Sequence, residues 1–526
     1  MKKLIGALFS IALALAVALP AAAATKGGKL VYARYADSLL LDPVFNDANV
    51  DIWILTNLYD TLFLPTDDGK DVQPGLATAY QASDDGMSYT ITLRQGVKFA
   101  DGTPMTADDV KWSLDRAANP KNGIWGFLLA SVDSVAVSAP DTITIKLKQP
   151  DPVLIKALAT FNAAILPMKA YEAAAGATDE EKAKTFAEHP IGTGPFKFVS
   201  WERNVTMKLV RNENYWRKDA AGQQLPYLDE IDFVTIPDDA TRILKLQAGE
   251  VDGAEFIPYA RVAELKADPN LDMQLWPSTK VNYLTLNVRP TFKDGSKNPM
   301  SDGRVRQAMN YAIDKDALIK IVTFDVAKPM TSFMSSSTPY VSGNGPAFPF
   351  DQAKAKALLA DAGFADGLDV TCLALAGSAD ETAILSTVQQ MWSQVGIRLK
   401  IEQVDNPTRT AKYRAGDFQM RVAGWTDDIA DPNEIVSYFA YSPNIESLHS
   451  GWEDKKVNGL FEASMKEMDA GKRQAQYKEI QDIYMAAPPI IPLYESPYPV
   501  AFRKSVKGFV QIPLGNNIFV GASVEK

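Results

Sequence analysis

Residues Gly96–Arg116 read GVKFADGTPMTADDVKWSLDR and carry closely spaced structural signals. The dipeptide Asp101-Gly102 is typical of a tight turn. Thr106 stands three residues before Asp109, which is the spacing of a capping box at the start of a helix. The helix that follows has one apolar stripe, made by Val110, Leu114 and Ala117. We therefore predict a turn and then an amphipathic helix.

Strand patterns flank this helix on both sides. Upstream, a Gln95-Gly96 turn predicts a hairpin whose alternating apolar residues are Tyr89, Ile91, Leu93, Val97 and Phe99. Downstream, a Pro140-Asp141 turn predicts a second hairpin whose alternating apolar residues are Val135, Val137, Ile143, Ile145 and Leu147. Residues 72–150 are therefore expected to be mainly β-structure around one helix.

Later in the chain, helices alternate with strands. One predicted helix has apolar residues at helical spacing, namely Val305, Ala308, Met309 and Ala312. A second begins at Asp351 and ends at Gly363. Asp369–Leu375 is typical of a strand, and a helix that Gly396 ends leads to another strand over 397–401. This β-α-β unit indicates an α/β fold.

The first residues predict export. Two lysines precede an apolar run over Leu4–Leu19, which has 16 residues, fewer than the roughly 20 that a membrane-spanning helix needs. Ala22-Ala23-Ala24 fits a cleavage site, so we expect residues 1–24 to be a signal peptide and the mature chain to begin near Thr25. No cysteine stands nearby to carry a lipid, so we expect a periplasmic protein without a membrane anchor.

Composition narrows the class of protein. The formal net charge is −10, and an acidic surface argues against nucleic acid or an anionic membrane as a partner. Cys372 is the single cysteine, and His189 and His449 are the only histidines, so we expect no disulfide, metal or other cofactor. A mature chain of about 500 residues exceeds what one hydrophobic core supports, so we expect two or three lobes in a monomer.

Motifs for catalysis are missing. The sequence contains no nucleophile elbow, phosphate-binding loop or zinc-binding helix. Gly192-Thr193-Gly194 begins like a dinucleotide fingerprint, but Pro195 and Phe196 follow where a helix should start, so we interpret it as a tight turn. We predict that the protein is not an enzyme and has no catalytic residues. A secreted hydrolase is the minor alternative.

Several motifs resemble one family over essentially the whole mature chain. The first is Val72–Arg116, VQPGLATAYQASDDGMSYTITLRQGVKFADGTPMTADDVKWSLDR. The others are GTGPFKFVSW (Gly192–Trp201), LVRNENYW (Leu209–Trp216), AGEVD (Ala248–Asp252), DGRVRQAMNYAIDKDALI (Asp302–Ile319) and GWTDDIADP (Gly424–Pro432). With these motifs the chain resembles the extracellular solute-binding proteins of ABC importers called family 5, which bind peptides, nickel or opines.

The resemblance implies a two-lobed, type II-like periplasmic binding protein fold of the large class, with an extra subdomain in lobe I. The implied ranges are 25–71, 189–276 and 494–526 for lobe I, 72–188 for the extra subdomain and 277–493 for lobe II. The solute is expected between the lobes, which close by a hinge motion and present it to the permease subunits of the importer.

We expect a peptide or a similar small charged solute. An opine, an oligosaccharide, haem or a metal chelate is the alternative within the family. A binder of unfolded chains is the alternative outside it.

The resemblance also points to residues that bind the ligand. In peptide-binding members, an aspartate three residues after a tryptophan holds the α-ammonium of the ligand, and Trp425 and Asp428 have this spacing, with Thr426 between them. A turn or cap role is the alternative for Asp428. Further candidates are placed by analogy, namely Trp125, Tyr283, Asn287 and Tyr494.

A ligand carboxylate would need a cation. Some oligopeptide binders carry an arginine three residues before the tryptophan, but here that residue is Val422. The candidate cation is therefore Arg414, with Arg409 and Arg421 near it in sequence. Asp431 precedes Pro432, and we predict that it caps a helix.

Overall fold

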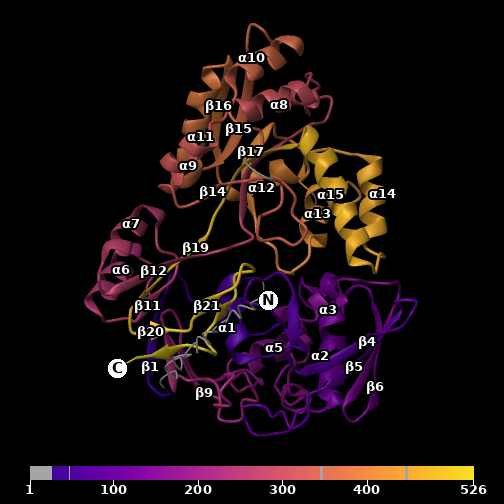
Figure 1. Cartoon of the computed structure of the whole chain (residues 1–526), viewed down its shortest axis with the longest axis vertical. Helices are drawn as coiled ribbons and strands as arrows, with labels where there is room; N and C mark the ends of the chain where they lie inside the picture. The colour runs from indigo at the N-terminus through magenta and orange to yellow at the C-terminus, as the bar shows by residue number, and fades with distance from the viewer. Residues whose placement is uncertain (1–25, 47, 344–346, 445–447, 526) are drawn as a thin grey trace, which may run out of the picture.

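The computed structural model of the protein describes residues 26–46, 48–343, 347–444 and 448–525. The predicted signal peptide and Thr25 lie outside these residues. Figure 1 shows a broad lower part and a narrower upper part. We call the lower part, which contains the seven-stranded and four-stranded sheets, the first lobe. We call the upper part, which contains the six-stranded sheet, the second lobe. None of the described helices is both long and apolar enough to cross a membrane.

The sheet of the first lobe is mixed. Its strand β1 is parallel to both of its neighbours, β10 and β11, and the other pairs are antiparallel. In sheet order the strands are β12 (Leu271–Trp276), β19 (Tyr498–Arg503), β11 (Gly253–Ala254), β1 (Lys29–Arg34), β10 (Glu230–Thr235), β9 (Thr206–Arg211) and β8 (Phe196–Glu202). The helices whose apolar side chains join its cores are α1 (Asn49–Leu58), α4 (Met168–Glu172), α5 (Asp179–Phe186), α6 (Asp239–Ala248) and α7 (Tyr259–Ala267).

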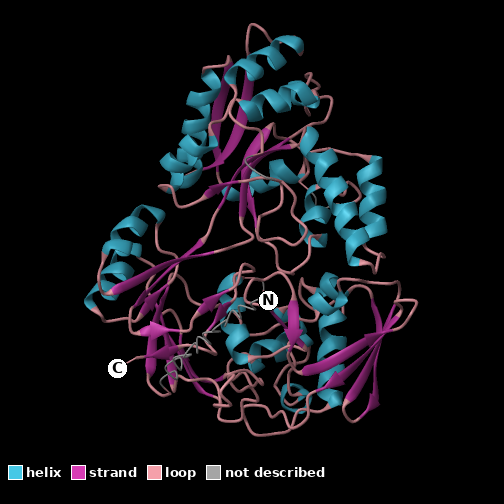
Figure 2. Cartoon of the chain, in the orientation of Figure 1, coloured by secondary structure: helices cyan, strands magenta, loops and turns pink. Residues whose placement is uncertain are grey.

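A four-stranded antiparallel sheet lies at the right of the lower part (Figure 2). In sheet order its strands are β4 (Ala77–Ala82), β5 (Ser88–Leu93), β7 (Thr142–Leu147) and β6 (Val132–Ala139). Helix α2 (Ala107–Ala118) packs against it with the predicted apolar stripe. The capping box is confirmed, because the Thr106 hydroxyl accepts the Asp109 N–H at 3.2 Å and Asp109 accepts the Thr106 N–H at 2.9 Å.

One of the two predicted hairpins is confirmed and the other is wrong. The second forms as β6 and β7. In place of the first, β5 pairs with β4 and β7. Gly96 makes the predicted turn with a φ of 76°, but Val97 and Phe99 are buried without forming a strand. The missed partner β4 exposes most of its residues, so it lacks the apolar alternation by which a half-buried strand is predicted.

The Gly192-Thr193-Gly194 segment packs closely against the end of α1. A Cβ atom on Gly194 would lie 2.5 Å from the carbonyl carbon of Leu58, so only glycine allows the backbone to approach the end of α1. The hydroxyl of Thr193 donates to buried Asp60 at 3.1 Å, and the indole N–H of Trp216 donates to the same carboxylate at 2.8 Å. The segment is therefore a structural turn, as predicted.

The second lobe is an α/β unit. In sheet order its strands are β14 (Lys328–Pro329), β18 (Ile490–Glu495), β13 (Val281–Leu286), β17 (Met420–Trp425), β15 (Leu368–Leu375) and β16 (Ile397–Val404). The predicted β-α-β unit is confirmed, since β15 and β16 are parallel and α11 (Ala379–Ser393) joins them. The two other predicted helices form as α8 (Gly303–Tyr311) and α10 (Gln352–Asp361).

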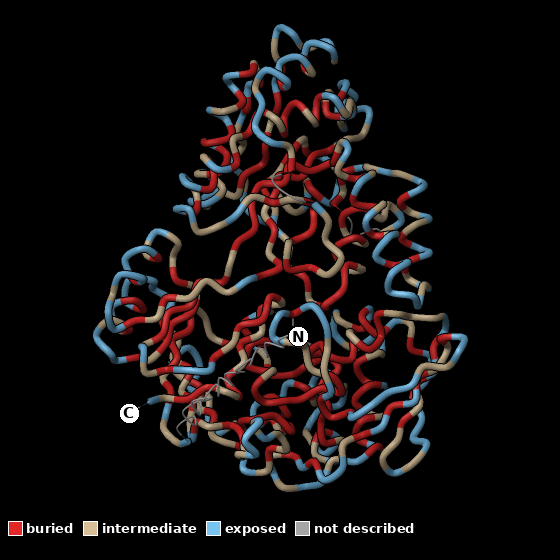
Figure 3. The backbone as a smooth tube through the Cα atoms, in the orientation of Figure 1, coloured by how far each residue is buried: buried red, intermediate tan, exposed pale blue. Residues whose placement is uncertain are grey.

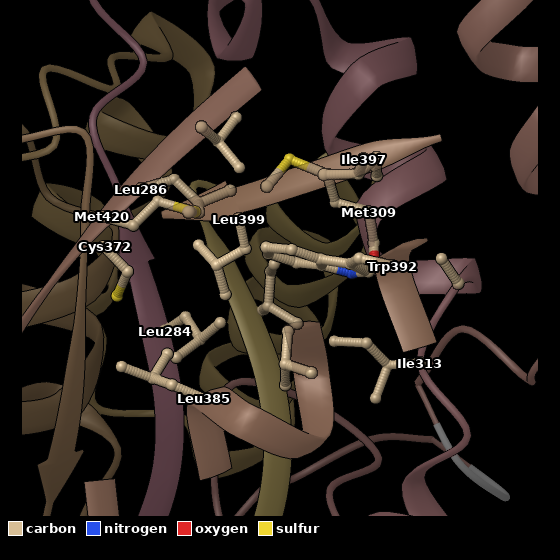
Figure 4. Packing of buried hydrophobic residues seen from close by; sticks show 14 of the residues in the cluster. Leu284, Leu286, Met309, Ile313, Cys372, Leu385, Trp392, Ile397, Leu399 and Met420 are labelled. Atoms are coloured by element: carbon tan, nitrogen blue, oxygen red, sulfur yellow. The ribbon is translucent and has the colours of Figure 1, made fainter. Parts of the chain in front are cut away.

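The core of this lobe lies between that sheet and its helices. Trp392 of α11 is fully buried there, and its indole N–H donates to the carbonyl of Met309 at 3.0 Å (Figure 4). Cys372 is buried in the same cluster. The remaining helices of the lobe are α9 (Lys315–Thr323), α12 (Asn406–Arg414), α13 (Asn433–Phe439), α14 (Lys455–Ser464) and α15 (Ala470–Ala486).

Shorter elements complete the chain. The short helices are α3 (Leu154–Ala157), α4 (Met168–Glu172), α5 (Asp179–Phe186), η1 (Gly126–Leu129), η2 (Phe161–Ala163) and η3 (Pro299–Ser301). The short strands are β2 (Phe63–Pro65), β3 (Val72–Pro74), β20 (Val506–Lys507), β21 (Val510–Gln511), β22 (Asn517–Ile518) and β23 (Ser523–Val524). Figure 3 shows buried residues inside both lobes and exposed residues at their rims.

Two short segments cross between the lobes. Residues 277–280 lead from β12 to β13, and residues 496–497 lead from β18 back to β19. The crossings hydrogen-bond to each other, because the Ser496 N–H donates to the Lys280 carbonyl at 3.1 Å and the Asn282 amide donates to the Ser496 hydroxyl at 2.7 Å. Such a short paired connection has the form of a hinge.

Candidate functional site

The GWTDD motif lies at the end of β17, where the chain turns toward the first lobe. The indole N–H of Trp425 donates to Oδ1 of Asp427 at 2.9 Å, and the hydroxyl of Thr338 donates to Oδ2 at 2.7 Å. The N–H of Asp427 donates in turn to the hydroxyl of Thr279 at 2.9 Å. Burial outweighs these hydrogen bonds and raises the pKa of Asp427 to about 7.

Asp428 and Glu434 form a close pair of carboxyl groups. Oε2 of Glu434, in the first turn of α13, accepts the backbone N–H of Asp428 at 2.8 Å, which brings the two carboxyl groups together. Two carboxyl groups this close repel each other when both are ionised. Burial raises the pKa of Asp428 to about 6, and burial together with the neighbouring carboxylates raises the pKa of Glu434 well above its usual range.

A third acid in this loop is already neutralised. Asp431 is fully buried, and Nη1 and Nη2 of Arg473 each donate to it at 2.9 Å. Nζ of Lys156, in the first lobe, lies 3.6 Å from Oδ2 of Asp431. Burial alone would raise the pKa of Asp431, but the hydrogen bonds and charge of Arg473 outweigh it and hold the pKa below its usual value. This ion pair ties the loop to α15.

A cavity of about 550 Å³ lies between the lobes beside this loop, and we call it the inter-lobe cavity. On the second lobe its wall includes Trp425 and Tyr438, whose rings stack with centroids 4.2 Å apart. On the first lobe it includes Asp151, which accepts the hydroxyl of Ser131 at 2.6 Å. Residues from both lobes therefore enclose one space.

A small apolar contact joins the lobes next to this space. Ile429 packs with Leu128 and Val153 of the first lobe. Ile429 also lines a smaller cavity, which Asp428 and Lys156 border. Ile429 thus lines both cavities, whereas Asp428 lines the smaller one.

Four carboxyl groups around the loop form no ion pair with a described residue, although the charge of Arg473 acts on Asp151. Within the described residues, no Lys or Arg ion-pairs with Asp151, Asp427, Asp428 or Glu434. The same part of the chain contains no group of three or more His, Cys, Asp or Glu that could hold a metal ion. Buried carboxylates are costly unless a cation or hydrogen bonds compensate them, so the arrangement favours a ligand that brings positive charge.

Four of the residues predicted from the sequence come together at this place. Asp428 borders the smaller cavity, and Trp425 borders the inter-lobe cavity. The side chain of Thr426 lies near Tyr498 of the first lobe. Trp125 packs against the Ile429 contact, and its indole N–H donates to the Asn46 carbonyl at 2.7 Å.

The other predicted residues lie elsewhere. Tyr283 and Tyr494 are buried in apolar clusters of the second lobe. The amide of Asn287 donates to the carbonyls of Gly416 and Phe418, which is a structural role. Arg414 is exposed at the end of α12. None of these four borders the inter-lobe cavity.

The predicted cap role of Asp431 needs correction. Its carboxylate accepts the N–H of Asn433 at 3.0 Å, but the N-cap position of α13 is Pro432, one residue later. The stronger interaction of Asp431 is the buried pair with Arg473. Pro432 itself has helical backbone angles, φ −71° and ψ −8°, so Asp431 still accepts an N–H of the first turn, as a cap side chain does.

Sequence reasoning missed Asp427, Glu434 and Asp151 as site residues. Asp151 looked like an acid before a proline in a loop, and nothing local distinguishes it. Glu434 is an acid in the first turn of a helix, a placement that the helix dipole favours in any protein. Only the turn of the loop, which brings the first turn of α13 back to Asp428, reveals the acidic pair.

Comparison with known proteins finds relatives over almost the whole chain. A family described as "Bacterial extracellular solute-binding proteins, family 5 Middle" matches residues 71–447. The glutathione-binding protein GsiB of Salmonella typhi is 32% identical over 511 residues, which are 95% of this chain and 96% of that protein. GsiB of Escherichia coli O1:K1 / APEC is 30% identical over 512 residues, 96% of each.

Solved structures agree with these sequence relatives. HbpA2 from Haemophilus parasuis matches with a TM-score of 0.83 at 27% identity, over 95% of this chain and 100% of that one. The periplasmic binding protein DppA from Helicobacter pylori, solved in complex with the peptide STSA, matches with a TM-score of 0.76 at 26% identity, over 95% and 99%. The predicted fold class is confirmed.

Proposed function

Because this chain belongs to the family 5 bacterial extracellular solute-binding proteins, we propose that its solute is a peptide or a similar small molecule with a free ammonium group. The solute enters between the lobes and places its ammonium at Asp428. No catalysis or cofactor is needed for this role. An oligosaccharide, one of the alternatives within the family, has no cationic group to pair with a buried acidic loop.

The observation that carries the proposal is the pair of carboxyl groups at the end of β17. Asp428 and Glu434 lie together without an ion-pair partner among the described residues, and burial raises the pKa of each. An ammonium group can compensate both carboxylates, since its three N–H donors match carboxylate oxygens. Asp427 beside them adds negative charge, and its own hydrogen bonds to Trp425 and Thr338 keep it in place.

An ammonium fits this loop better than a metal ion. A hard divalent cation takes six or more oxygen ligands, or a near-ideal octahedral set, and the described residues offer no such group. The names of the relatives support the same chemistry, because glutathione and the peptide STSA both carry a free amine. The ligand class therefore rests on charge and geometry together.

Capture proceeds by closure of the hinge. In this proposal, residues 25–71, 189–276 and 494–526 form lobe I, 72–188 form its extra subdomain and 277–493 form lobe II. The crossings at 277–280 and 496–497 bend, and ligand contacts to both lobes exist only when the lobes are closed, so binding shifts the population toward the closed form. The closed monomer delivers the solute to the permease of an ABC importer from the periplasm.

A thermal-shift panel tests the proposed solute class. Unfolded, washed and refolded protein is mixed with tripeptides, opines, oligosaccharides and nickel chelates. Tripeptides at one hundred times their Kd are expected to stabilise the native state by about 2.7 kcal/mol. Stabilisation by a neutral oligosaccharide or a nickel chelate, with none by any peptide, would contradict the proposal.

Peptide affinity is expected to fall in acid. Asp428 has a raised pKa of about 6 in the free protein, and only its ionised form attracts an ammonium. Binding therefore releases a proton below this pKa, and the association constant should drop by up to about tenfold per pH unit there. Calorimetry between about pH 5 and about pH 8 at constant ionic strength measures this. An affinity that is constant or rises in acid would count against an ammonium at Asp428.

A further inference from the structure

The geometry points to a second positive charge on the solute: the inter-lobe cavity receives a basic side chain, of the lysine or arginine type, from the same ligand whose ammonium meets Asp428. This inference rests on the proposed function and adds a preference among peptides. It concerns a space whose wall includes Ile429, which also lines the smaller cavity that Asp428 borders.

The described wall of the cavity contains acidic but no basic side chains. Two of the described residues that line it carry carboxyl groups, Asp151 from the first lobe and Glu434 from the second. Asp151 takes hydrogen bonds from the Ser131 hydroxyl at 2.6 Å and from the Val153 N–H at 2.8 Å, and neither donor is charged. A cation placed between the lobes would face an acid on each side.

Aromatic rings extend the same preference. The stacked rings of Trp425 and Tyr438 form part of the second-lobe wall, and a tryptophan face attracts a cation. The indole N–H of Trp425 is occupied by Asp427, which fixes the orientation of the ring. Phe127 and Leu128 of the first lobe add an apolar wall on which the aliphatic stem of a lysine or arginine can pack.

The charges at the contact between the lobes favour a cation in the cavity. Asp151 of the first lobe faces a loop of the second lobe in which Asp427, Asp428 and Glu434 have no ion-pair partner among the described residues. In the same part of the chain, Lys156 pairs across the lobes with Asp431, which already has Arg473. A basic ligand relieves the repulsion, whereas an acidic ligand increases it.

The cavity is large enough for this role. Its volume of about 550 Å³ lies within the range of small-molecule sites, roughly 300–1,000 Å³. Glutathione carries two carboxylates and one ammonium, so this wall should disfavour it. The chain would then differ in preference from the relatives named for glutathione.

The test is a set of tripeptides measured by calorimetry on the ligand-stripped protein. Lysine, leucine or glutamate is placed in turn at each of the three positions, with alanine elsewhere, and glutathione is included. At one position or more, the lysine peptide is expected to bind at least about tenfold tighter than the leucine peptide, and the glutamate peptide and glutathione weaker still. The leucine peptide is the control for packing of the aliphatic part of the lysine side chain.

A matched pair of variants locates the effect. Asp151→Asn keeps an acceptor for the Val153 N–H and removes the charge, so the ratio of lysine to leucine affinity should shrink to within about threefold. Asp133→Asn makes the same charge change on the exposed side of β6 and should leave the ratio unchanged. A cooperative melting curve establishes that each variant is folded.

Three outcomes overturn the inference, and they are distinguishable. Equal affinity for lysine and leucine peptides at every position, or tighter binding of glutamate peptides, refutes it and leaves the proposed function standing. A lysine preference that survives in Asp151→Asn shows that Asp151 does not select the basic side chain and also refutes the inference. Absence of binding by every tripeptide refutes the proposed function itself.

Discussion

Replacing Asp428 by asparagine is expected to weaken peptide binding by about hundredfold or more, because a ligand ammonium would lose its charged partner in a largely buried place. The same change should make the ligand-free protein more stable. A carboxyl group whose pKa rises on folding, here to about 6, destabilises the protein at pH values above that pKa. The gain on removing it is on the order of 1–2 kcal/mol after allowing for residual solvent contact.

Two measurements on the same variant check both parts of this prediction. Calorimetry with a tripeptide gives the affinity, and chemical denaturation without ligand gives the free energy of unfolding. Asp366→Asn, an exposed acid of the second lobe, serves as the control and should change neither. A variant that binds normally, or one that loses binding only because it has become unstable, would contradict the role of Asp428.

Arg473→Met is expected to destabilise the protein by about 3–5 kcal/mol, since the fully buried carboxylate of Asp431 would keep only its longer ion pair, with Lys156. Arg473 donates twice to Asp431 at 2.9 Å and once to the Ser464 carbonyl at 3.0 Å. After the change, Lys156 at 3.6 Å is the remaining ion-pair partner of Asp431 among the described residues. The loop from Asp427 to Asp431 would lose its anchor, so peptide affinity should fall as well.

Urea denaturation of the variant and the native protein measures the loss. The exposed pair between Arg398 and Asp369 has similar bidentate geometry, with distances of 2.6 and 2.8 Å, so Arg398→Met is the matched control. It should cost less than about 1 kcal/mol because solvent screens the pair. Equal losses in the two variants would mean that burial of the Asp431 pair does not matter, against this account.

Secondary structure could be predicted where one face of an element is buried and its ends carry specific signals. Helix α2 was predictable because the Thr106–Asp109 box and one apolar stripe agree. The unit β15-α11-β16 was predictable because buried parallel strands are apolar and Gly396 ends the helix region. Strand β4 was not, because an edge strand with exposed residues leaves no apolar alternation.

The site could be predicted only in part. The spacing of Trp425 and Asp428 identified the loop, since both residues belong to one continuous motif. Asp151 and Glu434 could not be found from the sequence, because their significance arises from how the lobes and the loop bring them together. Tyr283 and Tyr494 were chosen by analogy, and each packs in an apolar cluster, which is the commoner role of a buried tyrosine.

The central claim is that a ligand ammonium binds at Asp428, and comparing one tripeptide with its N-acetylated form tests it most directly. Acetylation removes the positive charge and leaves the rest of the peptide unchanged. Calorimetry on the native protein should show an affinity lower by about hundredfold or more for the acetylated peptide, and a much smaller difference in Asp428→Asn. Equal affinity of the two peptides for the native protein would contradict the claim.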